Sequence, residues 1–246
     1  MAYQHDRDLN LTYSPEKGYW HFVLYMEPDV GPGSALNGSQ ILEPSSSPYA
    51  AEWLSRLVPC DPDALHVALV GSDDAPKLWR PCVYDDSDSP SAVAGDGCIC
   101  WQTFRDPETL LPVAAHHYRT VSGNIEHWRH FTCAPLSLRD GERLSTIIID
   151  HDSHMFWVRT DGGTLHILPE RQGAGYGSGY SGGGSLELTL MIEKIANSDG
   201  YDVSAGILSG APNRKVRSWV ISPEANRTRE LTLDQLKFLC QAGIVE

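Results

Sequence analysis

The segment Arg171-Gln-Gly-Ala-Gly-Tyr-Gly-Ser-Gly-Tyr-Ser-Gly-Gly-Gly184 organises the C-terminal half of the chain, and seven of its residues are glycine. Backbone with so little side-chain cover approaches a ligand closely and adopts a positive φ without strain. An amphipathic helix is predicted to follow, and its first turn presents unpaired N–H groups and a partial positive charge that suit an anion. Two interpretations stay open: an anion-binding loop, or a tight packing turn or mobile flap.

The helix after the glycines is predicted over residues 185–197. Its apolar residues recur at i, i+3, i+4 and i+7 from Leu188 to Ile195, which is the spacing of one buried helical face. Gly200 provides a stop shortly after the last turn. The loop and this helix are therefore expected to form one unit.

Two other helices are predicted from their start signals. Ser47-Pro48 suits the N-cap and first residue of a helix that ends near Val58. Thr232 and Gln235 have the spacing of a capping box at the start of a last helix, for which Gly243 is the stop.

Short runs rich in apolar and β-favouring residues, separated by turn residues, predict strands along the rest of the chain. Residues 28–47, dense in Gly, Pro and Ser, are predicted to be a loop. The predicted strands are residues 20–26, 64–70, 98–104, 113–121, 125–133, 145–150, 154–160, 164–168 and 216–221.

These elements predict an α+β fold, mainly antiparallel sheet built from hairpins, with about three helices. A fresh set of hairpins begins near Pro135. The chain then divides into an α+β region over residues 1–135, which holds a histidine-rich hairpin, and a hairpin–glycine loop–helix region over residues 136–246. One continuous domain is the alternative.

The histidine-rich hairpin is predicted to carry a basic face. If its turn centres on Gly123, His117 opposes Arg129 and Arg119 opposes His127, and strand alternation places all four on one side. The arginines are then forked donors for phosphate or carboxylate, and His117 or His127 is the candidate general acid or base. The alternatives are a solvated face, or arginines paired with carboxylates elsewhere in the chain.

Three further segments contain residue types that commonly serve as metal ligands. Asp150-His-Asp-Ser-His154 offers the candidate ligands His151, Asp152 and His154, although the same residues suit a turn between two strands. The acidic segment 85–97 suits either a hard cation or a solvated loop. Cys98-Ile-Cys100 lacks the spacing and the partner pair of a zinc site, so we interpret both thiols as buried.

Composition narrows the class of protein. The chain has 246 residues, 41% of them hydrophobic and 21% charged, which is ordinary for a globular protein with a real core. A net charge of −13 disfavours non-specific binding to nucleic acids and acidic membranes. The first residues contain no apolar run of a signal peptide, and no apolar run is long enough to span a bilayer. We therefore expect a soluble cytoplasmic protein with free thiols.

The segment Gly179-Tyr-Ser-Gly-Gly-Gly-Ser-Leu-Glu-Leu-Thr-Leu-Met191 resembles a family of small bacterial and phage proteins of unknown function. Those proteins carry a Gly-Tyr-Gly-Gly-(small)-Gly-Pro segment after a β-hairpin and before a leucine-rich helix. Ser185 stands here where their pattern has proline, and the similarity covers about thirty residues. The resemblance implies a hairpin–glycine turn–helix unit and no particular activity.

The leading functional hypothesis is binding of, or catalysis on, a small anionic ligand, nucleotide-like or phosphorylated, held between the glycine loop and the hairpin. Its catalytic candidates are His117 and His127. Its ligand-binding candidates are Arg119, Arg129, Tyr176, Gly177, Gly179, Tyr180, Gly182, Gly183, Gly184 and Ser185. One alternative is an interaction or structural protein without chemistry, and another is a metal-dependent hydrolase. The residues indicate no particular cofactor and no particular protein partner.

Overall fold

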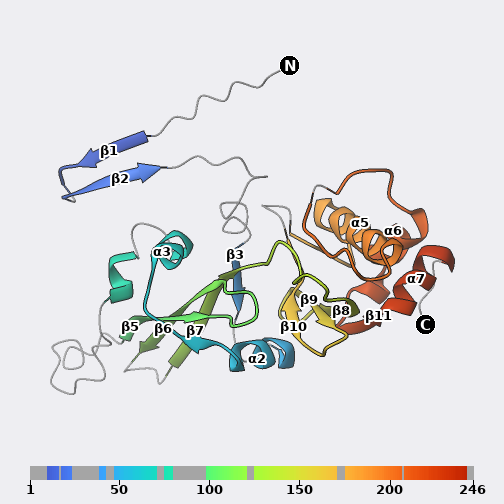
Figure 1. Cartoon of the computed structure of the whole chain (residues 1–246), viewed down its shortest axis with the longest axis horizontal. Coiled ribbons are helices and arrows are strands. Elements are labelled where there is room, and N and C mark those ends of the chain that lie inside the picture. Colours follow the sequence, from blue (N-terminus) through green and yellow to red (C-terminus); the bar gives the residue numbers. More distant parts are fainter. Residues whose placement is uncertain are drawn as a thin grey trace.

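The protein is an α+β structure built from antiparallel sheets, as the sequence predicts. A computed structural model describes residues 10–16, 18–23, 39–42, 47–70, 75–79, 98–120, 125–170, 175–206 and 208–242. Within these ranges the strands form three antiparallel sheets of two, five and four strands, accompanied by five α-helices (Figure 1). Two of these helices are additional to the three predicted.

The N-terminal part of the chain forms two of the sheets. The smaller sheet pairs β1 (Asn10–Ser14) with β2 (Tyr19–Val23). The five-stranded sheet has the order β3 (Ser39–Leu42), β7 (Ile125–Cys133), β6 (Pro112–Thr120), β5 (Cys98–Arg105), β4 (Val58–Pro59). The predicted strands at residues 98–104, 113–121 and 125–133 are confirmed. The predicted loop over residues 28–47 is wrong at β3, because pairing with the edge of β7 makes this short segment a strand.

The second large sheet follows Pro135 in the chain. Its order is β10 (Leu165–Ile167), β9 (Met155–Thr160), β8 (Leu144–Asp150), β11 (Arg229–Thr232). The three strands predicted between residues 145 and 168 are confirmed. Strand β11 was not predicted; its sequence is polar, and it becomes a strand by pairing with the free edge of β8.

The three predicted helices are α2 (Pro48–Ser55), α5 (Gly183–Asn197) and α7 (Leu233–Ala242). The Ser47 side chain caps α2 by accepting from the backbone N–H of residues 49 and 50. The capping box of α7 is also confirmed. The Thr232 backbone N–H donates to Gln235 Oε1 at 2.8 Å, and the Gln235 N–H donates to Thr232 Oγ1 at 3.3 Å.

Two predicted strands are wrong, because both are short helices. Residues 64–70 form α3 (Ala64–Val70), whose first N–H groups donate to Asp63 Oδ1, and a 3₁₀ helix, η2 (Ala75–Trp79), follows. Most of residues 216–221 belong to α6 (Arg214–Val220), which Asn213 caps in the same way, and η3 (Pro223–Ala225) comes next. Periodicity does not distinguish a short apolar run in a strand from one in a helix. The sequence signals that could have identified these two helices are their capping residues, Asp63 before α3 and Asn213 before α6.

The helices α5, α6 and α7 gather on one side of the four-stranded sheet (Figure 1). Their buried apolar residues form one cluster with β8, β9 and β11 that includes Leu188, Met191, Val216 and Leu236. A second cluster joins the two large sheets, since Trp53 of α2 lies between Val113 of β6 and Trp157 of β9. The predicted division near Pro135 stays a prediction, and apolar packing continues across it.

A buried ion pair reinforces the junction of the two sheets. Asp106, whose side chain is 1% exposed, accepts from Arg56 Nε at 2.9 Å and from Arg56 Nη2 at 2.7 Å. It also accepts from Trp53 Nε1 at 3.2 Å, and Arg56 Nη1 donates to the carbonyl oxygen of Leu165 in β10. Burial alone would raise the pKa of the Asp106 carboxyl. The hydrogen bonds and the positive charge of Arg56 have the opposite effect, and the net result is a pKa below the usual range.

We expect Asp106→Ala to lower the free energy of unfolding by about 3–5 kcal/mol, because it leaves the Arg56 guanidinium without its buried partner. Urea unfolding measures this loss. The matched control is Glu52→Ala, which removes a pair with Arg159 in which the carboxylate is 46% exposed. That control should cost less than about 1 kcal/mol. Equal losses in the two variants would show that the Asp106 pair does not hold the sheets together.

Candidate functional site

The predicted register of the histidine-rich hairpin is wrong by one residue. His117 lies opposite Trp128, and Arg129 lies opposite His116. Arg119 pairs with Glu126 instead of His127. The midpoint of the ladder falls between residues 122 and 123, whereas the prediction centred the turn on Gly123. A slip of this size exchanges every cross-strand partner, so the predicted pairs of the basic face do not form.

The two described members of that basic face occupy different environments. The His117 ring is buried and stacks on Trp128, with 4.1 Å between ring centroids, and its Nδ1 lies 3.6 Å from Cys100 Sγ. Arg129 is exposed and, by alternation, lies on the other face of the sheet. The side chains of Arg119 and His127 lie outside the described residues. The hairpin therefore does not present His117 and Arg129 to one ligand.

The glycine loop is described from Gly175 onward, and packing explains several of its glycines. A Cβ on Gly184 would lie 2.9 Å from the carbonyl oxygen of Gly175, so the start of α5 rests directly on loop backbone. A Cβ on Gly182 would lie 2.8 Å from the Tyr180 ring, which also covers Gly177. Gly179, at φ +78°, packs in the same way against Asn226. The packing-turn interpretation thus holds for most of these positions.

Two predicted ligand-binding side chains are instead part of the packed interior. The Tyr176 hydroxyl donates to the Pro169 carbonyl oxygen at 2.6 Å, and burial raises the pKa of Tyr176. Ser185 is fully buried, and its hydroxyl donates to the Tyr180 carbonyl oxygen at 2.5 Å. Tyr180 itself is 55% exposed. Of the three, Tyr180 is the one placed to contact a ligand.

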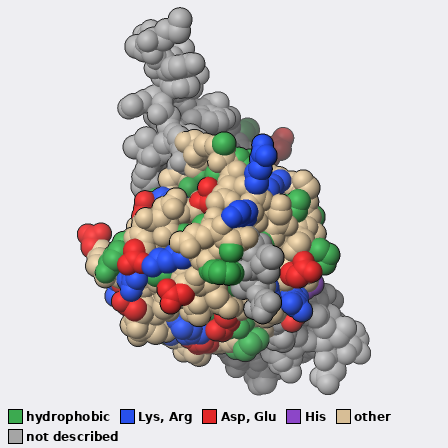
Figure 2. Space-filling model, turned by 90° about the vertical axis from the view of Figure 1, so that its right-hand side faces the viewer, with side chains coloured by type: hydrophobic (Ala, Val, Ile, Leu, Met, Phe, Trp, Pro, Cys, Tyr) green, Lys and Arg blue, Asp and Glu red, His purple; other side chains and the backbone are tan. Residues whose placement is uncertain are grey.

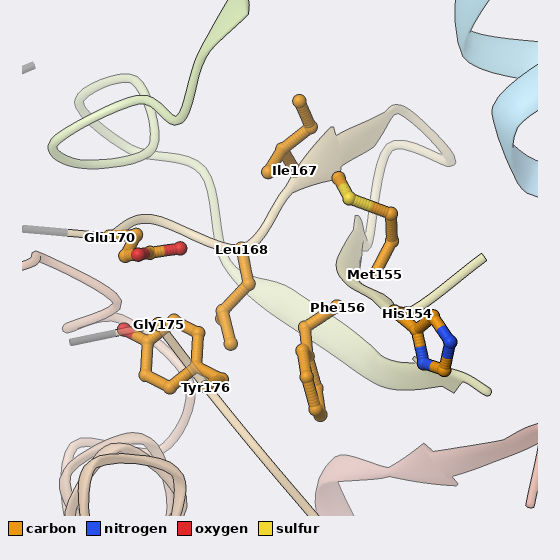
Figure 3. Close-up of a pocket in the computed structure, with 8 residues that line it drawn as sticks. All are labelled: His154, Met155, Phe156, Ile167, Leu168, Glu170, Gly175 and Tyr176. Carbon is orange, nitrogen blue, oxygen red and sulfur yellow. The ribbon is translucent and has the colours of Figure 1, made fainter. Parts of the chain in front are cut away.

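A small cavity of about 90 Å³ lies beside the start of the loop. Figure 3 shows Leu168 next to the Tyr176 and Phe156 rings, with Glu170 and His154 at opposite ends. Pockets for drug-sized ligands have volumes of roughly 300–1,000 Å³. This cavity is therefore too small for a nucleotide, and we interpret it as a packing gap beneath the loop.

At the N-terminus of α5, Gly183 is exposed, whereas Gly184 and Ser185 are buried. Gly182 is the N-cap and supplies no side-chain hydrogen bond, and the first turn contains no acidic residue. A Cβ on Gly183 would meet nothing within 4 Å. The first turn of this 15-residue helix therefore has neither a capping side chain at its N-cap nor an acidic residue of its own to complement the helix dipole.

Arg217 of α6 stands at this helix end, and sequence reasoning missed it. Its Nη2 donates to the Gly182 carbonyl oxygen at 3.4 Å. Its Nη1 is buried and has no hydrogen-bond partner among the described residues. Residues 216–221 were predicted to be a strand, so the position of Arg217 was not anticipated. In the structure, Arg217 belongs to α6, and this helix directs its side chain toward Gly182.

A second group of unsatisfied donors flanks α6 on the side away from Arg217. The Arg229 guanidinium lies over the Trp219 ring, 5.7 Å from its centroid. Neither Arg229 Nη1 nor the Trp219 indole N–H has a described partner. Burial and the neighbouring Arg227 lower the pKa of Arg229. Basic side chains on this end of the molecule lie among acidic and hydrophobic ones (Figure 2), so any attraction for an anion is local.

The segment from Asp150 to His154 forms a turn, which was one of its two interpretations. Asp150 is buried and accepts from Ser153 Oγ at 2.5 Å and from Trp157 Nε1 at 3.1 Å. His151 Nδ1 lies 3.7 Å from an Asp152 carboxylate oxygen. Among the residues the structure describes, no three His, Cys, Asp or Glu side chains gather closely enough to hold a metal ion. The acidic segment 85–97 lies outside those residues.

Cys60, Asp63 and His66 form a cluster that sequence reasoning also missed, although their regular spacing was visible. His66 Nδ1 lies 2.8 Å from Asp63 Oδ1, and its Nε2 lies 3.0 Å from the Phe104 carbonyl oxygen. Cys60 Sγ is 3.8 Å from the same Nε2. The Asp63 backbone N–H also donates to His66 Nδ1 at 3.3 Å, and burial raises the pKa of Cys60, which disfavours a reactive thiolate. We interpret the cluster as a structural tie between α3 and β5.

We expect Gly184→Ala and Gly183→Ala to differ in melting temperature. The added methyl at residue 184 meets backbone and should cost about 1–3 kcal/mol. At residue 183 it enters open space, so stability should be unchanged or slightly higher. Thermal unfolding of both variants tests the packing. Equal melting temperatures would mean that α5 does not rest on residues 175–177.

Comparison of the chain with protein-family models, with curated proteins and with solved structures gives no match. Among the described residues, no helix is both long and apolar enough to cross a membrane. The resemblance of residues 179–191 to small bacterial and phage proteins stays a prediction. The functional conclusion therefore depends on the geometry of the site.

Proposed function

We propose that the protein binds a small anionic ligand, through a phosphate or carboxylate group, at the N-terminus of α5. Tyr180, Gly182, Gly183 and Gly184 of the sequence hypothesis stay in this site, and Arg217 takes the place of the hairpin arginines. The proposal concerns binding, and we assign no reaction to the site.

The observation that carries the proposal is the buried Arg217 Nη1, which has no hydrogen-bond partner in the described part of the chain and lies beside an uncapped helix end. A buried donor without a partner costs about 1–3 kcal/mol. An anion at this point would accept from Arg217 and from the first N–H groups of α5 together, and the helix dipole favours the same charge. One ligand group therefore satisfies donors that come from two elements.

Tyr180 supports a ligand with a flat organic part. Its ring lies against Gly182 and Gly177, yet more than half of the side chain remains exposed. A ring in this position offers a stacking surface next to the proposed anion site. A nucleotide-like ligand thus fits the arrangement, whereas the alternative of a metal-dependent hydrolase finds no ligand set at His151, Asp152 and His154.

Calorimetric titration with inorganic phosphate and with AMP tests the proposal. We expect Arg217→Ala to weaken binding at least about tenfold, because it removes a charge-assisted hydrogen bond. The control is Arg214→Ala, which removes an exposed arginine from the same helix and should change affinity by less than about twofold. Gly183→Asp should abolish binding while the fold persists, because its carboxylate occupies the helix end.

Two results would overturn the proposal. One is the absence of binding of either anion to the unmodified protein at concentrations up to about 10 mM, a range that detects even millimolar dissociation constants. The other is an affinity that falls equally in Arg217→Ala and Arg214→Ala, which would indicate attraction by overall charge instead of a built site. Tighter binding of AMP than of phosphate would support the role of Tyr180.

A further inference from the structure

An open groove is present whose lining includes no residue of the glycine loop. It is lined by residues 108–111, which belong to the connection from β5 to β6, and by residues 135–140, which lead from the five-stranded to the four-stranded sheet. Its volume is about 520 Å³. This size falls within the range of roughly 300–1,000 Å³ in which small-molecule sites are found.

His166 of β10 lines the groove and is the reason to regard it as a site. The residue is 1% exposed, and neither ring nitrogen has a hydrogen-bond partner among the described residues. The carboxylate oxygen Glu142 Oε2 lies 3.6 Å from His166 Nε2. Burial lowers the pKa of His166, so the ring is neutral at neutral pH and one nitrogen offers a lone pair. The lone pair on this buried ring nitrogen therefore has no hydrogen-bond donor among the described residues, and a ligand could supply one.

Exposed leucines form the apolar part of the groove. Leu110 is 65% exposed and has φ +59°, a conformation that costs a leucine roughly 1–2 kcal/mol. Hydrogen bonds hold it there: its N–H donates to the Asp106 carbonyl oxygen at 2.8 Å, and its carbonyl oxygen accepts from Arg105 at 2.9 Å. Leu136, on the opposite side, is 37% exposed. The fold thus fixes apolar side chains in contact with solvent on both sides of the groove.

The charge of the lining decides which ligand fits. Glu108 and Asp140 line the groove, and Glu142 lies behind His166. Arg139, the one cation among the described lining residues, is already paired with Glu108 at 2.8 Å and donates to the Pro107 carbonyl oxygen at 3.0 Å. The lining therefore presents acceptors and excess negative charge, which favour a cation and oppose a carboxylate or phosphate.

We infer that this groove binds a small organic cation, namely a protonated amine on an apolar body. The apolar body lies between Leu110 and Leu136. The ammonium group donates to the unpaired nitrogen of His166 and is attracted by the acidic side chains around it. This site is separate from the proposed anion site on α5, and its charge preference is the opposite.

Titration of the whole protein with hexylammonium, 1-hexanol and hexanoate, monitored by NMR, tests the inference. The three probes share an alkyl chain and differ in the charge of the head group. We expect hexylammonium to bind at least about tenfold more tightly than 1-hexanol, and hexanoate to bind more weakly than either. Shifts of the His166 ring signals should accompany hexylammonium binding.

Leu110→Asn tests the apolar wall without disturbing the fold, because asparagine tolerates a positive φ. We expect this variant to weaken hexylammonium binding roughly fivefold or more. The control is Phe238→Asn on α7, another exposed apolar residue far from the groove, which should leave the affinity unchanged.

His166→Phe should reduce the preference for hexylammonium over 1-hexanol, and this ratio stays informative if the variant is less stable. The inference is overturned if hexanoate or 1-hexanol binds as tightly as hexylammonium, if Leu110→Asn has no effect, or if no probe binds at up to about 10 mM.

Discussion

The ion pair between Arg56 and Asp106 is the constraint on which the arrangement of the two large sheets depends. Its carboxylate is almost completely buried and accepts from Trp53 of α2 and from Arg56, the residue that follows this helix. Arg56 also donates to the backbone of β10. Removal of charge from water is costly, so such a pair is tolerated where hydrogen bonds satisfy both partners. The same carboxylate accepts from Glu108 N–H and Thr109 Oγ1, and it thereby shapes one wall of the groove that contains Leu110.

The glycine loop combines tightly packed positions with one open position at the start of a helix. Gly177, Gly179, Gly182 and Gly184 are required where side chains or backbone come too close for a Cβ. Gly183 has no such requirement, and it lies at the end of a helix whose dipole is not compensated. Packing brings α5 and α6 together, and in doing so places Arg217 beside the N-cap residue of α5, where Arg217 Nη2 donates to the Gly182 carbonyl oxygen.

Sequence patterns predicted the fold class, most strands of both large sheets and the three longer helices, because those elements have clear periodicity and caps. They failed where tertiary contacts decide the outcome. The short strands β3 and β11 form because β7 and β8 offer free edges. The hairpin register depends on a turn that the sequence locates only to within one residue. The glycine-rich backbone that precedes a helix was predicted from the sequence, and its part in a binding site stays a prediction. Arg217 and His166 were missed, since their significance lies in unsatisfied donors and acceptors that only packing creates.

The most direct measurement of the central claim is an NMR titration of the ¹⁵N-labelled protein with inorganic phosphate, followed through the backbone amides of Gly183 and Gly184 and the Arg217 side chain. These signals should shift together along one saturating curve, because one anion contacts all three groups. Signals of the hairpin strands β6 and β7 should stay in place. Shifts confined to the hairpin, or small unsaturated shifts spread over many basic residues, would contradict the assignment of an anion site to the N-terminus of α5.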